Sequence, residues 1–118
     1  MIEKVVLDYL TAELDVPVMM EAPEVPSEDF PEVPARFVVI EKVGARKENR
    51  GNTASIAFQS YAESMYEAAA LDEAVREAVE NIIVLNAIAG VRLTSNYNHT
   101  DPRTKQYRYQ CVYEFYFV

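Results

Sequence analysis

The chain has 118 residues, of which half are hydrophobic by type and a quarter are charged, and its formal net charge is -8 at pH 7. A chain of this length buries roughly two-thirds of the surface that its unfolded form exposes, so we expect a single soluble domain over residues 1–118 with one core. The excess of acidic residues argues against sequence-specific or duplex nucleic-acid binding by phosphate neutralisation. The single cysteine, Cys111, excludes an internal disulfide framework and a multi-cysteine zinc site.

The first predicted element is an amphipathic N-terminal helix within residues 1–15. Its apolar residues recur at spacings of three and four, which is the helical period: Ile2, Val5, Val6, Tyr9, Leu10 and Leu14. Pro17 disfavours helix at the residue before it, so the helix should end near Asp15 and a short extended piece should follow over residues 16–21. Glu3 and Asp8 lie where a secretory signal would be cationic and apolar, so we expect no such signal.

Residues 22–35 form a proline-rich acidic arm. Prolines fix their own φ and remove amide donors, which excludes a helix or a central strand here. The arm should therefore be extended and exposed, and its length exceeds that of most loops in compact domains. Phe30, between Asp29 and Pro31, is a candidate anchor. It could hold the arm to a partner or to the chain's own core, and the sequence leaves both open.

Two strands with a basic tip are predicted next. Residues 36–43 are apolar on both faces in their middle, which suits a central strand. Residues 44–52 carry two of the three glycines and should form a turn, followed by alternation that places Ala54, Ile56 and Phe58 on one face. The hairpin tip would carry Arg46, Lys47 and Arg50.

The main helix is predicted to begin at a capping box formed by Ser64 and Glu67. An apolar stripe then continues for about six turns, from Ala68 to Leu85 or Asn86, and Gly90 ends the segment. The opposite face should be acidic and lie in water, with one arginine among its residues: Glu67, Asp72, Glu73, Arg76, Glu77 and Glu80.

A second hairpin completes the chain. Residues 91–97 alternate, residues 98–103 are rich in turn formers, and the closing strand alternates over about fourteen residues. Its tyrosines, together with Tyr97, could stack on bases, but they share a face with Cys111, Phe115 and Phe117, which favours a core role under the helices. The predicted fold class is α+β, with an antiparallel sheet of four to five strands packed on one face by the N-terminal helix and the long central helix; residues 36–118 hold the sheet and main helix.

Residues suited to catalysis are few, so we expect no enzyme, cofactor or metal. His99 is the only histidine, and Cys111 lies on an apolar face twelve residues away. Three glycines in total cannot build a phosphate-binding loop of either common pattern. The longest nearly apolar run, residues 82–91, is about half a bilayer span, so no membrane segment is expected.

Charge is unevenly distributed along the chain. Residues 1–35 hold nine acids and one base, residues 36–62 five bases and two acids, and residues 63–80 six acids and one base. Such asymmetry suits head-to-tail contact between copies, although it can equally serve solubility alone. The candidate subunit interface comprises an acidic and a basic set: Glu21, Glu24, Glu28 and Phe30 on the arm side, and Arg46, Lys47 and Arg50 on the hairpin.

Four stretches resemble a known family: VPVMMEAPEVP after the first helix, RFVVIEKVG, ASIAFQSYAESMYEAAAL leading into the main helix, and NHTDPRTKQYRYQCVYEFYF at the end. They are similar to the small tail terminator, or tail completion, proteins of long non-contractile-tailed bacteriophages and prophages. The resemblance covers nearly the whole chain, and its most specific parts are residues 59–64 and 107–110.

The resemblance implies a non-enzymatic component of the virion tail, made in the bacterial host cytoplasm. Such a protein forms a ring, typically of six copies, on the head-proximal end of the tail tube. Its partners would be other copies of itself, the tail tube protein and the head-tail connector protein. Two alternatives stay open: another connector or neck protein of the head-tail joint, and a cytoplasmic module that binds a peptide or small ligand.

Overall fold

The computed structural model describes residues 1–22, 34–48, 51–100 and 106–118. Two helices, α1 (Ile2–Glu13) and α2 (Met65–Glu80), accompany a five-stranded sheet whose spatial order is β1-β2-β3-β5-β4. The strands are β1 (Val18–Met19), β2 (Phe37–Glu48), β3 (Gly51–Ala62), β4 (Ile88–Asn98) and β5 (Tyr107–Phe117). All neighbours pair antiparallel except β1, which runs parallel to β2. The predicted α+β class is confirmed, with a sheet that is mostly antiparallel.

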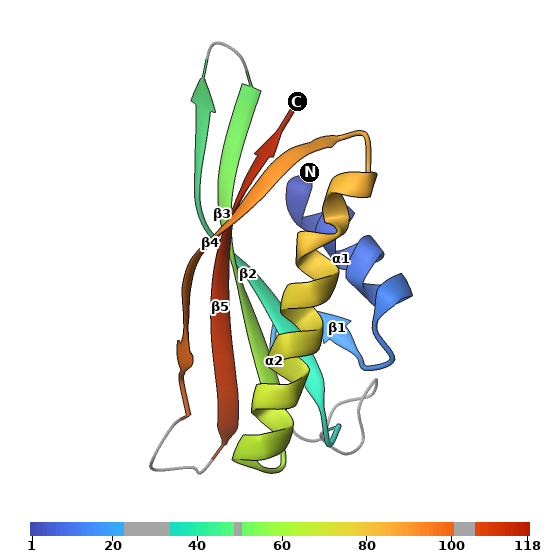
Figure 1. The fold of residues 1–118 in the computed structure, drawn as a ribbon, viewed down its shortest axis with the longest axis vertical. Coiled ribbons are helices and arrows are strands. Elements are labelled where there is room, and N and C mark those ends of the chain that lie inside the picture. Colours follow the sequence, from blue (N-terminus) through green and yellow to red (C-terminus); the bar gives the residue numbers. More distant parts are fainter. Residues whose placement is uncertain (23–33, 49–50, 101–105) are drawn as a thin grey trace.

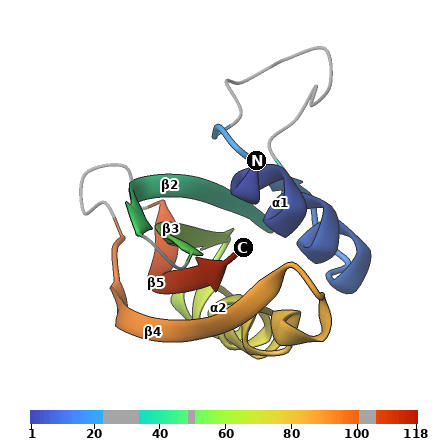
Figure 2. The same cartoon turned by 90° about the horizontal axis from the view of Figure 1, so that it is seen from above.

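Both helices cover the same face of the sheet, as expected from their apolar stripes (Figures 1 and 2). The core between them joins Val6 and Leu10 of α1 and Val75 and Val79 of α2 to Phe58 of β3, all fully buried. The two helices are also tied together by a hydrogen bond in which the Tyr9 hydroxyl donates to the Ala78 carbonyl at 2.9 Å. One face of the sheet is thereby closed to solvent by helices.

The main helix begins where the capping box predicts and ends earlier than expected. Ser64 Oγ accepts from the Glu67 amide at 3.1 Å, which satisfies one orphan donor of the first turn. The predicted six turns to Asn86 are wrong, because α2 stops at Glu80 and Asn81 hydrogen-bonds back to the Glu77 and Ala78 carbonyls. The next residues, 82–84, are all β-branched and lose side-chain freedom in a helix, and they continue only as one 3₁₀ turn, η1 (Ile82–Val84).

The turn predicted over residues 44–52 is also wrong, because most of it is strand. β2 continues to Glu48 and β3 starts at Gly51, so Arg46 pairs with Thr53 and Lys47 with Asn52. A bulge between Lys42 and Gly44 absorbs one extra residue, which lets the chain stay extended instead of turning at Gly44. The glycine that the hairpin does need is Gly51, whose φ is +152° and where a Cβ would lie 3.2 Å from the Phe117 carbonyl oxygen.

The alternation of the last strand is confirmed for its central residues and fails for its partner strand. Cys111, Tyr113 and Phe115 are buried under the helices, although β5 has 11 residues and not about fourteen. Tyr97, predicted on the core face, is 42% exposed on the other face. A register shift between Leu93 and Ser95 reverses the alternation of β4 after that point, so that Tyr97 pairs with Gln110.

The paired strands β2 and β3 project beyond the helices at the end of the molecule that also holds both termini (Figure 1). The molecule measures 44 × 29 × 22 Å along its principal axes. The start of β2 lies at the opposite end, beside β1, because Met19 pairs with Val39. A charged residue at the start of β2 and one at its end are therefore separated by most of the length of the strand.

Candidate assembly surfaces

The face of the sheet opposite the helices carries a row of hydrogen-bonded polar side chains, which we call the polar row. Arg108 Nη1 donates to the Tyr61 hydroxyl at 2.8 Å, and that hydroxyl donates to Gln59 Oε1 at 3.1 Å. Gln59 Nε2 then donates to Gln110 Oε1 at 3.1 Å, and Gln110 Nε2 donates to the Tyr97 hydroxyl at 2.7 Å. The row crosses β3, β5 and β4, and each side chain in it has a partner, which holds this face in one arrangement.

An aromatic stack ends the polar row on the β2 side. The Phe37 and Tyr61 rings lie 4.6 Å apart and 8° from parallel, and the Arg108 guanidinium lies 5.6 Å from the Tyr61 ring centroid. Arg108 Nε also donates to the His99 carbonyl at 2.7 Å. Because Phe37 and Tyr61 are both almost fully buried, this stack is packing and not an exposed platform for bases.

Glu114 on β5 forms ion pairs with two arginines of other strands on the same face, Arg46 and Arg92; we call these three residues the Glu114 cluster. Its carboxylate lies 3.6 Å from Arg92 Nη2 of β4 and 4.0 Å from Arg46 Nη2 of β2. The pKa of Glu114 is lowered, chiefly by a hydrogen bond from the Tyr116 hydroxyl and further by the two guanidiniums. Two of the basic residues on this face are thus partly neutralised.

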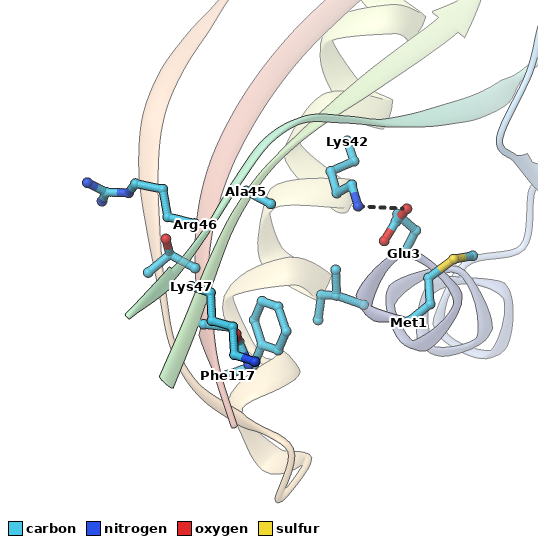
Figure 3. Close-up of a pocket in the computed structure, with 10 residues that line it drawn as sticks. Met1, Glu3, Lys42, Ala45, Arg46, Lys47 and Phe117 are labelled. Atoms are coloured by element: carbon cyan, nitrogen blue, oxygen red, sulfur yellow. Dashed lines mark ion pairs between the residues drawn. The ribbon is translucent and has the colours of Figure 1, made fainter. Parts of the chain in front are cut away.

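A cleft of about 470 Å³ opens between the N-terminus of α1 and the projecting strands; we call it the hairpin cleft (Figure 3). Lys42 Nζ pairs with Glu3 Oε2 at 3.4 Å on one side, and Lys47 stands beside Phe117 on the other. Arg46 lies on the rim and points away from the Lys42–Glu3 pair. The cleft therefore combines two cations with apolar surface.

The outer surface of α2 is acidic around a single base. Glu73, Glu77 and Glu80 line a shallow depression with Arg76 and Asn81, and the four charged residues sum to -2. This agrees with the predicted acidic face for these residues. It places negative charge on the helix side of the molecule and positive charge on the projecting strands, so the two lie on different surfaces of one copy.

Asp72 departs from that prediction, because it is buried instead of lying on the acidic face. Its side chain is 2% exposed and accepts from Arg76 Nε at 3.0 Å and from Asn96 Nδ2 of β4 at 3.0 and 3.2 Å. Burial and, to a lesser extent, the nearby Asp72 carboxylate raise the pKa of the Cys111 thiol. Asp72 thus links α2 to the edge strand β4 through hydrogen bonds, a contact that we call the brace. The raised pKa keeps Cys111 as a neutral thiol.

The predicted interface residues fall into three groups. Arg46 and Lys47 are exposed near the end of β2, as expected for a basic tip. Glu21 is exposed just after β1, at the other end of β2. The remaining four, Glu24, Glu28, Phe30 and Arg50, lie outside the described residues. Within one copy, then, Glu21 and Lys47 belong to opposite ends of the sheet.

Two features of these surfaces were missed by sequence reasoning. The Glu114 cluster depends on the registers that join four neighbouring strands, β2, β3, β5 and β4. The only available signal was the outward position of Glu114 in the β5 alternation. The cleft depends on the bulge after Lys42, which reverses the alternation of β2 and so places Lys47 on the same face as Lys42. Bulges have no dependable sequence pattern apart from the glycine that follows this one.

Among the described residues there is no group of three or more histidines, cysteines, aspartates or glutamates placed to hold a metal ion. The His99 ring packs edge-on against Tyr97 at 5.4 Å, and Cys111 is fully buried, so neither is paired with the other. Over the same described ranges, no helix is both long and apolar enough to cross a membrane. No family model and no curated protein matches the chain.

Proposed function

We propose that this protein is a tail terminator of a long non-contractile-tailed phage or prophage. In this proposal, copies assemble as a ring on the head-proximal end of the tail tube, stop its polymerisation and present the surface that joins the head-tail connector. In this proposal the protein acts only by binding its partners; it catalyses no reaction and uses neither a metal nor a cofactor. The likeness of its sequence to that family and three features of its surface support this function.

The observation that carries the proposal is the division of the sheet into two unlike faces. Helices bury one face, while the other bears the polar row and the Glu114 cluster. When copies stand side by side in a ring, this second face can turn toward the axis with the helices outside. Arg46 and Arg92 are held by Glu114, and Arg108 by Tyr61 and the His99 carbonyl, so a lumen lined this way would bind DNA weakly.

The strand edges supply a route for contact between copies. Among the described residues, β4 has no neighbour on its outer side, and β1 pairs only with Val38 and Val39 of β2. The pairings make β4 and β2 antiparallel to each other, so the β4 edge of one copy can extend the sheet at the β2 edge of the next. Because the two edges differ, such a contact is head-to-tail and can close into a ring.

The charge distribution favours the same head-to-tail geometry. The acidic surface of α2 and the basic projecting strands cannot meet within one copy, but they can meet between copies. Reversing the basic side with Arg46→Glu, Lys47→Glu and Arg50→Glu together should abolish the ring and leave the fold intact, as judged by light scattering and circular dichroism. An unchanged assembly would remove these strands from the interface.

The test is to add the purified protein to isolated tail tubes and image them by electron microscopy. The proposal predicts extra density at one end of each tube and none along its sides. Tubes with bare ends would overturn it. Binding to tailless capsids with no binding to tubes would instead favour a connector or neck protein.

A further inference from the structure

We propose that the hairpin cleft binds residues 21–33 of a neighbouring copy, with Phe30 seated on its apolar surface and the acidic residues against its cations. This inference rests on the proposed ring and deepens it, because it names the contact that links one copy to the next. It assigns the cleft a ligand of defined chemistry: an acidic, extended peptide with one aromatic side chain.

The cleft offers the features that such a peptide needs. Its apolar surface comes from Met1, Ile2, Ala45 and Phe117, and Lys47 stands over Phe117 (Figure 3). Lys47 has no acidic partner within the described parts of the chain. Lys47 is thus placed to receive a carboxylate.

Glu3 provides a second and independent sign of an absent partner. Its Oε2 is paired with Lys42, but its Oε1 is buried and has no hydrogen-bond donor among the described residues. A buried acceptor without a donor is costly, about 1–3 kcal/mol for a neutral group and more for a charged one. The Glu3 side chain is 18% exposed, so a rotation of its carboxylate would let the backbone amides of an extended peptide in the cleft supply that donor.

Residues 21–33 complement this site in both charge and apolar content. They contain five acidic residues and no basic one, and their one aromatic side chain is Phe30. Three prolines within the same stretch limit its backbone freedom, so less conformational entropy is lost when it binds. Outside this segment, no stretch of thirteen residues in the chain combines five acids, no base and an aromatic residue.

Chain length favours a neighbouring copy as the source of the peptide. The side of the cleft that carries Lys47 and Phe117 is ten residues along β2 from Phe37, which is roughly 33 Å at the usual strand rise. Phe30 precedes Phe37 by seven residues, and seven residues span at most about 25 Å when fully extended. Bends at residues 35 and 36 shorten that reach. The backbone of Phe30 therefore cannot reach the Lys47 side of the cleft of its own copy, whereas a neighbouring copy is under no such limit.

A crosslinking experiment on the full chain tests the contact directly. The double variant Glu28→Cys/Asn52→Cys places one thiol on the arm and one on the cleft wall, and it keeps Phe30 and Lys47. Mild oxidation should give a ladder of disulfide-linked multimers on a non-reducing gel, and the buried Cys111 should contribute no background. The matched control is Glu28→Cys/Tyr66→Cys, since Tyr66 is exposed at the opposite end of the molecule; it should give no ladder. A cyclised monomer or an unlinked monomer from the test variant would overturn the inference.

A binding experiment separates this contact from the proposed function. A labelled peptide of residues 21–35 should bind the full-length protein in fluorescence anisotropy, and both Lys47→Glu in the protein and Phe30→Ser in the peptide should weaken binding at least tenfold. Arg36→Glu makes the same charge change at the far end of β2 and should alter binding less than twofold. Equal binding by all variants would overturn the contact. Rings formed on tube ends by the Lys47→Glu protein would also overturn the contact, but they would leave the tail terminator function standing. Failure of the wild-type protein to bind tube ends would overturn that function whatever the peptide does.

Discussion

Replacing Asp72 with alanine should destabilise the protein by about 2–3 kcal/mol. The buried carboxylate accepts from Arg76 and from Asn96, and hydrogen bonds to a charged group contribute about 1.5–3 kcal/mol each. Two circumstances reduce the cost: Arg76 is 29% exposed and can turn to water, and Asn96 Nδ2 keeps a second acceptor in the Gln110 carbonyl at 3.2 Å. In addition, alanine has a higher helix propensity than aspartate, which stabilises the variant by about 0.6 kcal/mol and offsets part of the loss.

Urea unfolding and thermal melts measure this loss. For 118 residues, an unfolding entropy of about 2.1 cal/mol/K per residue converts 2–3 kcal/mol into a fall in Tm of about 8–12 °C. Glu73→Ala is the matched control, because it removes the same charge from the exposed side of α2 and should change stability by about 0.5 kcal/mol or less. A loss below about 1 kcal/mol for Asp72→Ala, equal to that of the control, would refute the brace between α2 and β4.

Three further predictions concern the core and the Glu114 cluster. Phe58→Ala should cost about 3–5 kcal/mol in urea unfolding, since the ring is fully buried between Tyr113 and Phe115; a cost under about 1.5 kcal/mol would contradict that packing. Cys111 should react with a thiol reagent at pH 8 at least about a hundredfold more slowly in the folded protein than in urea, because it is buried and its pKa is raised; fast labelling of the folded state would be inconsistent with this. The pKa of Glu114 is lowered, so wild type should be more stable than Glu114→Gln above about pH 5, and the difference should vanish as the pH falls through the folded-state pKa; a difference that grows on acidification would refute the cluster.

Features encoded by a few neighbouring residues could be predicted from the sequence. Ser64 and Glu67 define the start of α2 because a cap is a local hydrogen bond, and the alternation around Cys111, Tyr113 and Phe115 defines the buried face of β5 because side chains in a strand alternate. The helix stripes likewise predicted that α1 and α2 share one face of the sheet.

Features that depend on partners distant in sequence could not be predicted. The bulges at Val43 and Thr94 change which side Lys47 and Tyr97 face, and nothing local marks the second of them. Asp72 looks like one more residue of an acidic helix surface until Asn96 is seen opposite it. The hairpin cleft is of the same kind, since it joins α1, β2, β3 and the end of β5.

The central claim is that this protein ends the growth of a tail tube. The most direct measurement is the length of tubes assembled from purified tube protein on preformed tube seeds, with and without this chain in substoichiometric amount. Growth should stop at one end of each seed, and that end should carry a ring of density. Tubes that elongate at both ends to the same length as in its absence would contradict the account.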